Sequence, residues 1–186
     1  MNEYHKIQTL FKRDMTKKNS PIIMGDWTLP EFEYLQNNEW VFTEKVDGTN
    51  IRVMWDGKNV VFGGKTDDAQ MPVFLLYKLQ EFFEGTEKKK LFTDTFGEEG
   101  NVCLYGEGYG AKIQKGGGNY IPDGVSFVLF DVKIGGLWLQ REDVEGIAGK
   151  FGLKVVPIIG EGTLHDMIKI VQGGQTSKWG RFDAEG

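Results

Sequence analysis

The sequence predicts an α+β fold built mainly from antiparallel sheets with flanking helices. Three observations support this class: the chain has 26 glycines, aromatic residues make up 13% of it, and short alternating segments end in Asp-Gly or Gly-Gly pairs. Many glycines beside many aromatics are typical of short strands joined by tight turns. Strand pairs of this kind with few helices indicate antiparallel pairing. Neither a repeat nor a low-complexity linker interrupts the 186 residues, so we expect one domain over 1–186.

The first predicted elements are three strands that form a meander. Residues 40–46, 50–55 and 58–62 have the alternation of strands, and an Asp-Gly pair follows each of the first two. In this arrangement Lys45 lies at the end of the first strand.

Three helices are expected further along the chain. Residues 72–84 begin with a proline, which suits a first turn, and repeat apolar residues at helical spacing. Residues 141–151 are followed by a glycine that can end a helix. The last helix begins at Thr163, and Asp166 follows at the spacing of a capping box.

The remaining strands are short and apolar. We expect them at residues 101–105, 126–132, 137–139 and 155–159. The second of these is strongly apolar, and a Gly-Gly turn leads from it to the third. With the meander, they complete a mainly antiparallel set.

Composition limits the class of protein. A net charge of -5 argues against a non-specific polyanion binder but leaves room for a local basic groove. Lysines cluster at 17–18, at 88–90, and at 112 with 115, and solvated surface is the plain interpretation of each cluster. The single cysteine, the absence of an apolar signal segment and the lack of a membrane-length apolar run lead us to expect a cytoplasmic location, in a phage-infected or host cell, with no membrane association.

Two glycine-rich segments imitate phosphate-binding motifs. Gly63-Gly64-Lys65-Thr66 lacks the earlier glycine of a P-loop, because Asn59 occupies that position. Residues 106–110 contain three glycines, but no helical pattern follows them, as a dinucleotide fingerprint requires. We therefore exclude both motifs.

Several side chains could carry chemistry. Lys45, beside an Asp-Gly turn, is either an exposed edge residue or a nucleophile, which must lose its proton to react. Glu107 stands between two glycines, which would let a ligand approach the backbone closely. Asp131 lies within an apolar strand, so it needs either a structural hydrogen bond or a metal-linked ligand. His5 and His165 are too isolated for a metal triad, and we expect His165 on the surface.

The ordered set of motifs resembles the covalent nucleotidyltransferases, and in particular RNA ligases of the RNA ligase 2 type. Glu44-Lys45-Val46-Asp47-Gly48-Thr49-Asn50 is similar to their motif I. Residues 104–110, 127–132 and 184–186 resemble motifs III, IIIa and IV, and residues 4–14 resemble the start of the phage enzymes. The resemblance implies a nucleotidyltransferase (adenylation) fold over the whole chain.

The resemblance also implies a reaction and its reactants. A lysine takes AMP from ATP, AMP passes to an RNA 5′-phosphate, and a 3′-hydroxyl then seals the end, with Mg²⁺ neutralising phosphate charge. ATP, Mg²⁺ and RNA with 5′-phosphate and 3′-hydroxyl ends are therefore the expected cofactors and partners. No protein partner is indicated.

Roles follow from the resemblance residue by residue. Lys45 is expected to be the nucleophile, and Glu185 to hold the metal and the lysine. Lys65 is expected to contact phosphate or ribose. The other expected nucleotide-binding residues are Glu44 through its backbone against adenine, Asp47, Gly48, Asn50 toward the nucleotide or RNA end, Glu107 at the ribose, and Phe130 stacked on adenine.

One departure concerns the end of the sequence. The family carries a lysine-bearing motif V after motif IV, and these residues end at Gly186, within motif IV. The expectation is that they adenylate poorly or not at all while a full-length parent ligates, and rapid AMP attachment would contradict it. Two alternatives stay open: a DNA ligase or capping-type nucleotidyltransferase, and an inactive nucleotide- or RNA-binding module.

Overall fold

A computed structural model describes residues 3–184 and confirms the predicted mixture of helices and antiparallel strands. The described residues divide into two compact units. The first unit consists of residues 3–4, 44–157 and 176–184, and the second of 5–43 and 158–175. Whether they form the single domain expected from the sequence stays a prediction.

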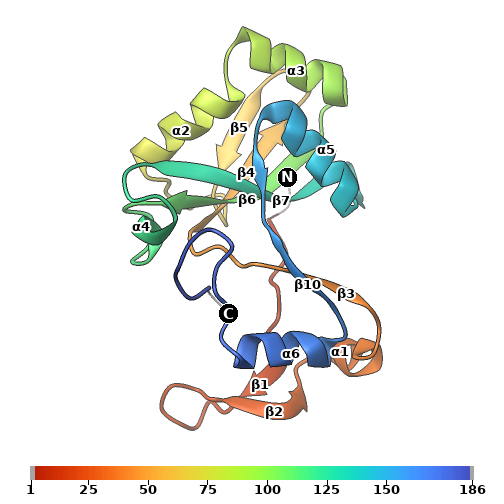
Figure 1. The fold of residues 1–186 in the computed structure, drawn as a ribbon. Helices are drawn as coiled ribbons and strands as arrows, with labels where there is room; N and C mark the ends of the chain where they lie inside the picture. The colour runs from red at the N-terminus through yellow and green to blue at the C-terminus, as the bar shows by residue number, and fades with distance from the viewer. Residues whose placement is uncertain (1–2, 185–186) are drawn as a thin grey trace. The chain divides into compact units, whose positions relative to one another are not determined.

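A six-stranded sheet is the frame of the first unit, in the order β5-β4-β6-β7-β8 with β9 pairing beside β7. Figure 1 labels β5, β4, β6 and β7 of this sheet. All pairs are antiparallel except the parallel pair of β7 and β9. The strands are β4 (Thr49–Trp55), β5 (Val60–Gly63), β6 (Val102–Gly110), β7 (Val125–Ile134), β8 (Leu137–Trp138) and β9 (Lys154–Val155). The helices are α2 (Val73–Phe83), α3 (Thr86–Phe96), α4 (Gly117–Tyr120) and α5 (Arg141–Phe151).

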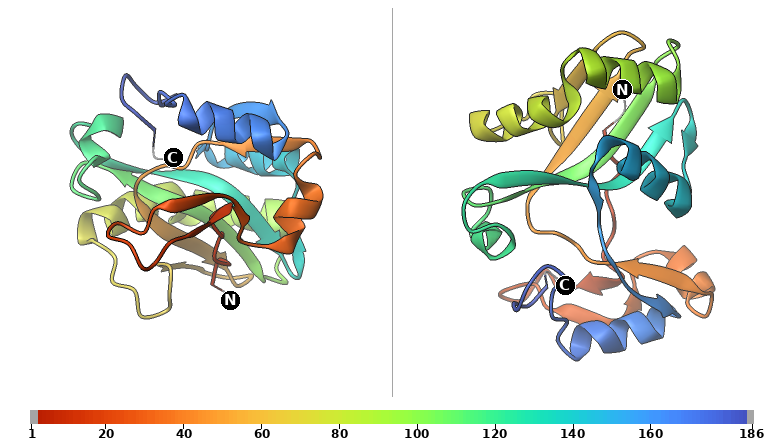
Figure 2. Two further views of the ribbon diagram at one scale, coloured as in Figure 1. Left: turned by 90° about the horizontal axis from the view of Figure 1, so that it is seen from below. Right: turned by 45° about the horizontal axis from the view of Figure 1, so that its top comes forward.

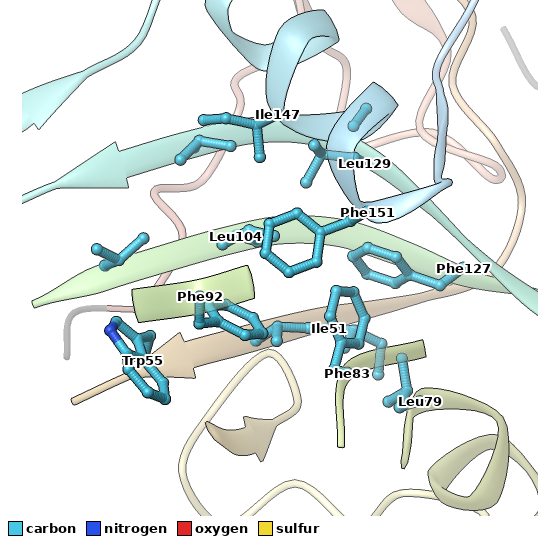
Figure 3. Packing of buried hydrophobic residues seen from close by; sticks show 14 of the residues in the cluster. Ile51, Trp55, Leu79, Phe83, Phe92, Leu104, Phe127, Leu129, Ile147 and Phe151 are labelled. Atoms are coloured by element: carbon cyan, nitrogen blue, oxygen red, sulfur yellow. The ribbon is translucent and has the colours of Figure 1, made fainter. Parts of the chain in front are cut away.

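One face of this sheet is covered by α2, α3 and α5, whose apolar side chains form one core with the strands (Figures 1 and 2). The rings of Phe83, Phe92, Phe127 and Phe151 meet at its centre, with Phe92 and Phe151 4.6 Å apart between centroids (Figure 3). Full burial of such a side chain contributes about 1.5–3 kcal/mol. Residues 72–84 and 141–151 were predicted as helices and are confirmed as α2 and α5 within a residue.

Alternation along the strands leaves the second face of the sheet for other side chains. In β4, Ile51, Val53 and Trp55 enter the core. Successive side chains of a strand point to opposite faces, so Asn50 and Arg52 lie on the face away from α2, α3 and α5. We call this the open face, meaning the face of the sheet that α2, α3 and α5 do not cover.

The predicted meander is wrong in its first strand. β3 (Trp40–Thr43) does not pair with β4; it pairs with β10 (Ile158–Gly162) in the second unit. Residues 44–48 do not turn back as a tight hairpin, because Glu44 and Val46 are buried in the first unit and keep the chain extended. Lys45 therefore lies in an extended connection after β3 and not at a hairpin end.

The second unit contains a hairpin, a strand pair and two helices. Its elements are β1 (Phe11–Arg13), β2 (Ile22–Trp27), α1 (Pro30–Leu35), β3, β10 and α6 (Leu164–Gln172). The predicted capping box is confirmed, since the Thr163 hydroxyl accepts from the Asp166 N–H and the Asp166 carboxylate accepts from the Thr163 N–H. His165 is exposed, as expected. No helix of the described part of the chain is long and apolar enough to cross a membrane.

Candidate functional site

The open face of the sheet brings the predicted site residues into one row. Asn50 in β4 is directly opposite Glu107 in β6, and Glu107 is opposite Val128 in β7. Directly opposed side chains in an antiparallel pair lie about 4.5–5.5 Å apart at Cβ. The amide of Asn50 and the carboxylate of Glu107 are therefore neighbours on this face.

A β-bulge adds Phe130 to the same face. Tyr105 pairs with Asp131 and Gly106 pairs with Leu129, so Phe130 has no counterpart on β6. An inserted residue of this kind shifts the alternation by one position and re-aims the side chains beside it. Phe127 and Leu129 before the bulge, and Val132 after it, face the core, whereas Phe130 packs with the buried cluster of the open face.

The glycines that flank Glu107 serve packing and not ligand approach. A Cβ at Gly106 would lie 2.2 Å from Cζ of Phe127, and a Cβ at Gly108 would lie 2.6 Å from Cδ2 of Leu75. Both glycines face the core of the first unit, so the sequence-based interpretation of their role is wrong. Glu107, between them, points to the opposite face.

Asp131 has the structural partner that its burial demanded. The Tyr4 hydroxyl donates to Asp131 Oδ2 at 2.5 Å, and the Tyr4 ring contacts Phe130 edge-on with centroids 5.0 Å apart. Burial and the adjacent carboxylate raise the pKa of Tyr4 far above its ordinary value, so its hydroxyl stays a donor at neutral pH. Of the two interpretations left open for Asp131, this contact favours the structural hydrogen bond.

Lys45 is exposed, and the residues on both sides of it are held firmly. Glu44 and Val46 are buried, and Val46 belongs to the buried cluster against which Phe130 packs. The Asp47 N–H donates to the Tyr120 hydroxyl at 3.1 Å, and the Gln114 side-chain amide donates to the Gly48 carbonyl at 3.0 Å. The backbone that carries Lys45 is thus fixed to the open face.

Gly48 lies directly against Glu107. A Cβ at Gly48 would be 2.8 Å from Cγ of Glu107 and 2.3 Å from the Gly108 carbonyl oxygen. No side chain fits at this position, so glycine is required for the segment after Lys45 to reach the Glu107 side chain.

Lys65 is exposed in the segment that follows β5. Arg52 pairs with Gly63, the last residue of β5, and Lys65 follows two residues later in a bend. The Arg52 guanidinium, with 0% of the side chain exposed, donates to the Gly64 carbonyl at 2.8 Å and to Asp67 Oδ1 at 2.7 Å. Arg52 thereby anchors the segment that carries Lys65.

Sequence reasoning missed three residues of this site. Arg52 left a signal, since it alternates with the apolar residues of β4 and shares a face with Asn50. Tyr120 and Gln114 left none, because they contact residues 47 and 48 from positions more than sixty residues further along the chain. Glu185, predicted for catalysis and metal binding, lies outside the described residues.

The open face contains an unsatisfied acceptor. Oδ1 of Asn50 is buried and has no hydrogen-bond partner among residues 3–184. Buried polar atoms normally have partners, and an exception calls for an explanation such as a missing ligand. The thiol of Cys103 is not a candidate nucleophile, because burial raises its pKa to about 11. Within the same residues no group of three His, Cys, Asp or Glu side chains could hold a metal ion.

Comparison with known proteins gives one family and one set of solved structures. The RNA ligase family model matches residues 38–186. No curated protein sequence matches.

Similar solved structures include several forms of an RNA ligase from Naegleria gruberi. A lysine-to-alanine variant with ATP and Mn is 18% identical over 84% of this chain and 47% of that chain, with a TM-score of 0.66. A lysine-to-methionine variant with AMP and Mn gives the same values. The form with PPi is 18% identical over 98% of this chain and 57% of that chain, with a TM-score of 0.65. At this identity the likeness shows a shared fold, and the chain spans about half the length of these structures.

Proposed function

Because this chain belongs to the RNA ligase family, we propose that it is the nucleotidyltransferase part of an ATP-dependent RNA ligase, with Lys45 as the nucleophile. One observation carries the proposal. The bulge in β7 turns Phe130 to the face that holds Asn50 and Glu107, and the backbone on either side of Lys45 packs against this same group. A purine would stack on Phe130, and ribose hydroxyls would donate to Glu107.

In the proposed first step the Lys45 amine attacks the α-phosphate of ATP. A nitrogen–phosphorus bond forms, the bond from the α-phosphorus to the bridging oxygen breaks, pyrophosphate leaves, and the amine loses a proton to solvent. AMP then passes to the 5′-phosphate of RNA, and a 3′-hydroxyl displaces AMP as the phosphodiester forms. The solved structures with ATP, AMP and PPi belong to the Naegleria gruberi enzyme and agree with such a sequence of steps.

The open face suits a nucleotide. The unpaired Asn50 oxygen can accept from a nucleotide hydroxyl, and the Glu107 carboxylate lies directly opposite Asn50 in the β4–β6 register. Magnesium, when bound with ATP, would neutralise part of the phosphate charge. We assign its ligand among the predicted residues to Glu185, and to Lys65 a contact with phosphate or ribose. Asp47 and Gly48 hold the connection between Lys45 and β4 in place, and we assign the Glu44 backbone to a contact with the base.

The test is the intact mass of the chain after long incubation with ATP and Mg²⁺. We expect a slow gain of one AMP, in keeping with poor adenylation, none in Lys45→Ala, and the same slow gain in Lys89→Ala, which removes an exposed lysine of α3. An adduct that persists in Lys45→Ala would refute the assignment of the nucleophile. Labelling by GTP in place of ATP would point to a capping-type enzyme, and the absence of any adduct would leave a nucleotide- or RNA-binding module.

The RNA step needs a separate measurement. The adenylated chain is mixed with RNA strands that meet as a 5′-phosphate and a 3′-hydroxyl, and with the same strands lacking the phosphate. We expect joined product only in the first mixture, because the phosphate is the acceptor of AMP. Joining without the 5′-phosphate would contradict the proposed end specificity.

A further inference from the structure

The Glu44 carboxylate is a buried charged group to which the proposed reaction gives no task. Its residue is 3% exposed and directly precedes Lys45. Oε1 accepts from the Ser177 hydroxyl at 2.5 Å, and Oε2 accepts from the Lys178 N–H at 2.8 Å. These donors follow 133 and 134 positions later in the chain. The contact therefore joins the lysine segment to a distant part of the same unit.

We propose that Glu44 is a positioning residue whose carboxylate fixes the loop Thr176–Asp183 to the segment that carries Lys45. This inference rests on the proposed function of Lys45. It differs from the expected backbone contact of Glu44 with adenine, because here the side chain acts, and it acts on protein.

The loop has the internal bonds of a fixed element. Thr176 and Asp183 form a β-bridge, and the Ser177 N–H donates to the Phe182 carbonyl at 2.9 Å. The Ser177 oxygen also accepts from the Trp179 N–H at 3.0 Å. Ser177 thus contacts the Glu44 carboxylate and also two backbone groups of the loop, those of Trp179 and Phe182.

The same loop supports the segment on the far side of Lys45. The ring of Phe182 meets Tyr120 edge-on with centroids 4.9 Å apart, and Trp179 packs on Tyr109 at 5.1 Å. Tyr120 in turn accepts the hydrogen bond from the Asp47 N–H. Lys45 is therefore held between two anchors of one loop: Glu44 before it, and Asp47 through Tyr120 after it.

Charge makes the first anchor firm. A buried carboxylate is costly without donors, and hydrogen bonds to a charged acceptor are roughly twice as strong as neutral ones. A nucleophile gains rate from being held close to its attack geometry, and a misplacement of about 1 Å can cost about 10²-fold. Loosening the loop should therefore slow the attack more than it weakens ATP binding.

The experiment compares Ser177→Ala, Ser177→Thr and Glu44→Gln in the full chain, with Thr95→Ala in α3 as a control for loss of a hydroxyl elsewhere in the unit. Hydrogen exchange reports the loop, and the rate of AMP attachment against ATP concentration reports the site. We expect the Lys178 and Trp179 amides to exchange at least tenfold faster in Ser177→Ala and Glu44→Gln, with β4 and β6 unchanged. The attachment rate at saturating ATP should fall at least tenfold while the half-saturating ATP concentration changes less than threefold.

Ser177→Thr keeps the hydroxyl and should restore most of both quantities, and Thr95→Ala should match the parent chain. Unchanged exchange at Lys178, or faster exchange with an unchanged attachment rate, would overturn the positioning role and leave the proposed function intact. A parent chain that never gains AMP would overturn the proposed function and the positioning role together. A fall in rate with equally faster exchange in β4 and β6 would show general unfolding and overturn the role of Glu44.

Discussion

Gly106 must be a glycine because of core packing, although its place beside the site residue Glu107 suggests a role in ligand binding. It adjoins Glu107, and a site residue between glycines is naturally interpreted as one that leaves room for a ligand. In the structure, the Phe127 ring occupies the position that a Gly106 side chain would take. Glycine is thus required by the face of β6 that packs in the core, whereas the site residue Glu107 points to the opposite face.

Replacing Gly106 by alanine should destabilise the first unit. The added methyl would lie 2.2–2.3 Å from the Phe127 ring and the Val128 carbonyl oxygen, and such overpacking costs about 1–3 kcal/mol. Urea unfolding at neutral pH measures the change in the free energy of unfolding. Gly118→Ala is the matched control, since nothing lies within 4 Å of its added methyl, and an equal loss in both variants would contradict the explanation.

Arg52 is the buried cation of the open face, and its replacement by methionine should free the segment after β5. The Gly64 carbonyl would lose its donor, and an unpaired buried polar group costs about 1–3 kcal/mol. Urea unfolding reports the loss in the free energy of unfolding, and hydrogen exchange across residues 64–69 reports the local release. Asp67→Asn should have a smaller effect, because the Asp67 side chain is 81% exposed and surface ion pairs contribute little. A larger effect for Asp67→Asn would contradict this order.

Most site residues could be predicted singly, but not their arrangement. Lys45, Glu107 and Phe130 were recognisable from motifs, and the register brings Asn50 beside Glu107. Tyr120, Gln114 and Ser177 could not be found, because side chains that contact residues 44–48 from distant parts of the sequence leave no local pattern.

At the scale of elements, the bulge in β7 shows in the spacing of its core-facing residues. Core-facing residues follow at 127, 129, 132 and 134, and the step of three between Leu129 and Val132 breaks strict alternation. A regular strand cannot produce that step, so these core-facing positions mark one inserted residue, which the continuous apolar run at 127–130 conceals in the sequence. The pairing of β3 with β10 could not be predicted, because strands of compatible alternation do not reveal their partners at long sequence separation.

The α6 cap gives a pH dependence at the scale of an element. Hydrogen bonds from Thr163, with Lys169 nearby, lower the pKa of Asp166 from 3.8 to about 2. A carboxyl whose pKa is lower in the folded state stabilises fully above about pH 4, and this contribution disappears as the pH falls toward 2. Circular dichroism during urea unfolding between pH 2 and 5 should show this loss in the parent chain.

Asp166→Asn should flatten that dependence, because the side chain no longer titrates. Thr163→Ala removes the partner hydroxyl and should cost about 1 kcal/mol near neutral pH. If Asp166→Asn kept the full pH dependence of the parent, another carboxyl would be responsible.

At the scale of the molecule, the two units should differ in local stability. In the described residues only Phe11, Phe42 and Leu164 of the second unit are buried apolar side chains, whereas the first unit has a core of sixteen. We expect backbone amides of β3, β10 and α6 to exchange faster than those of β4, β6 and β7, because openings of a small core cost less free energy. Hydrogen exchange with mass spectrometry measures this, and equal protection of the two sets would show that both open as one cooperative body.

The order in which the chain visits the two units limits how it can be dissected. It crosses between them after residues 4, 43, 157 and 175, so neither unit is a continuous fragment. Deleting the first 43 residues would take Tyr4 from Asp131 and leave β10 without β3. A gene shortened at its 5′ end would therefore damage both halves at once, and a minimal version of the first unit would need two linkers, one in place of residues 5–43 and one in place of residues 158–175.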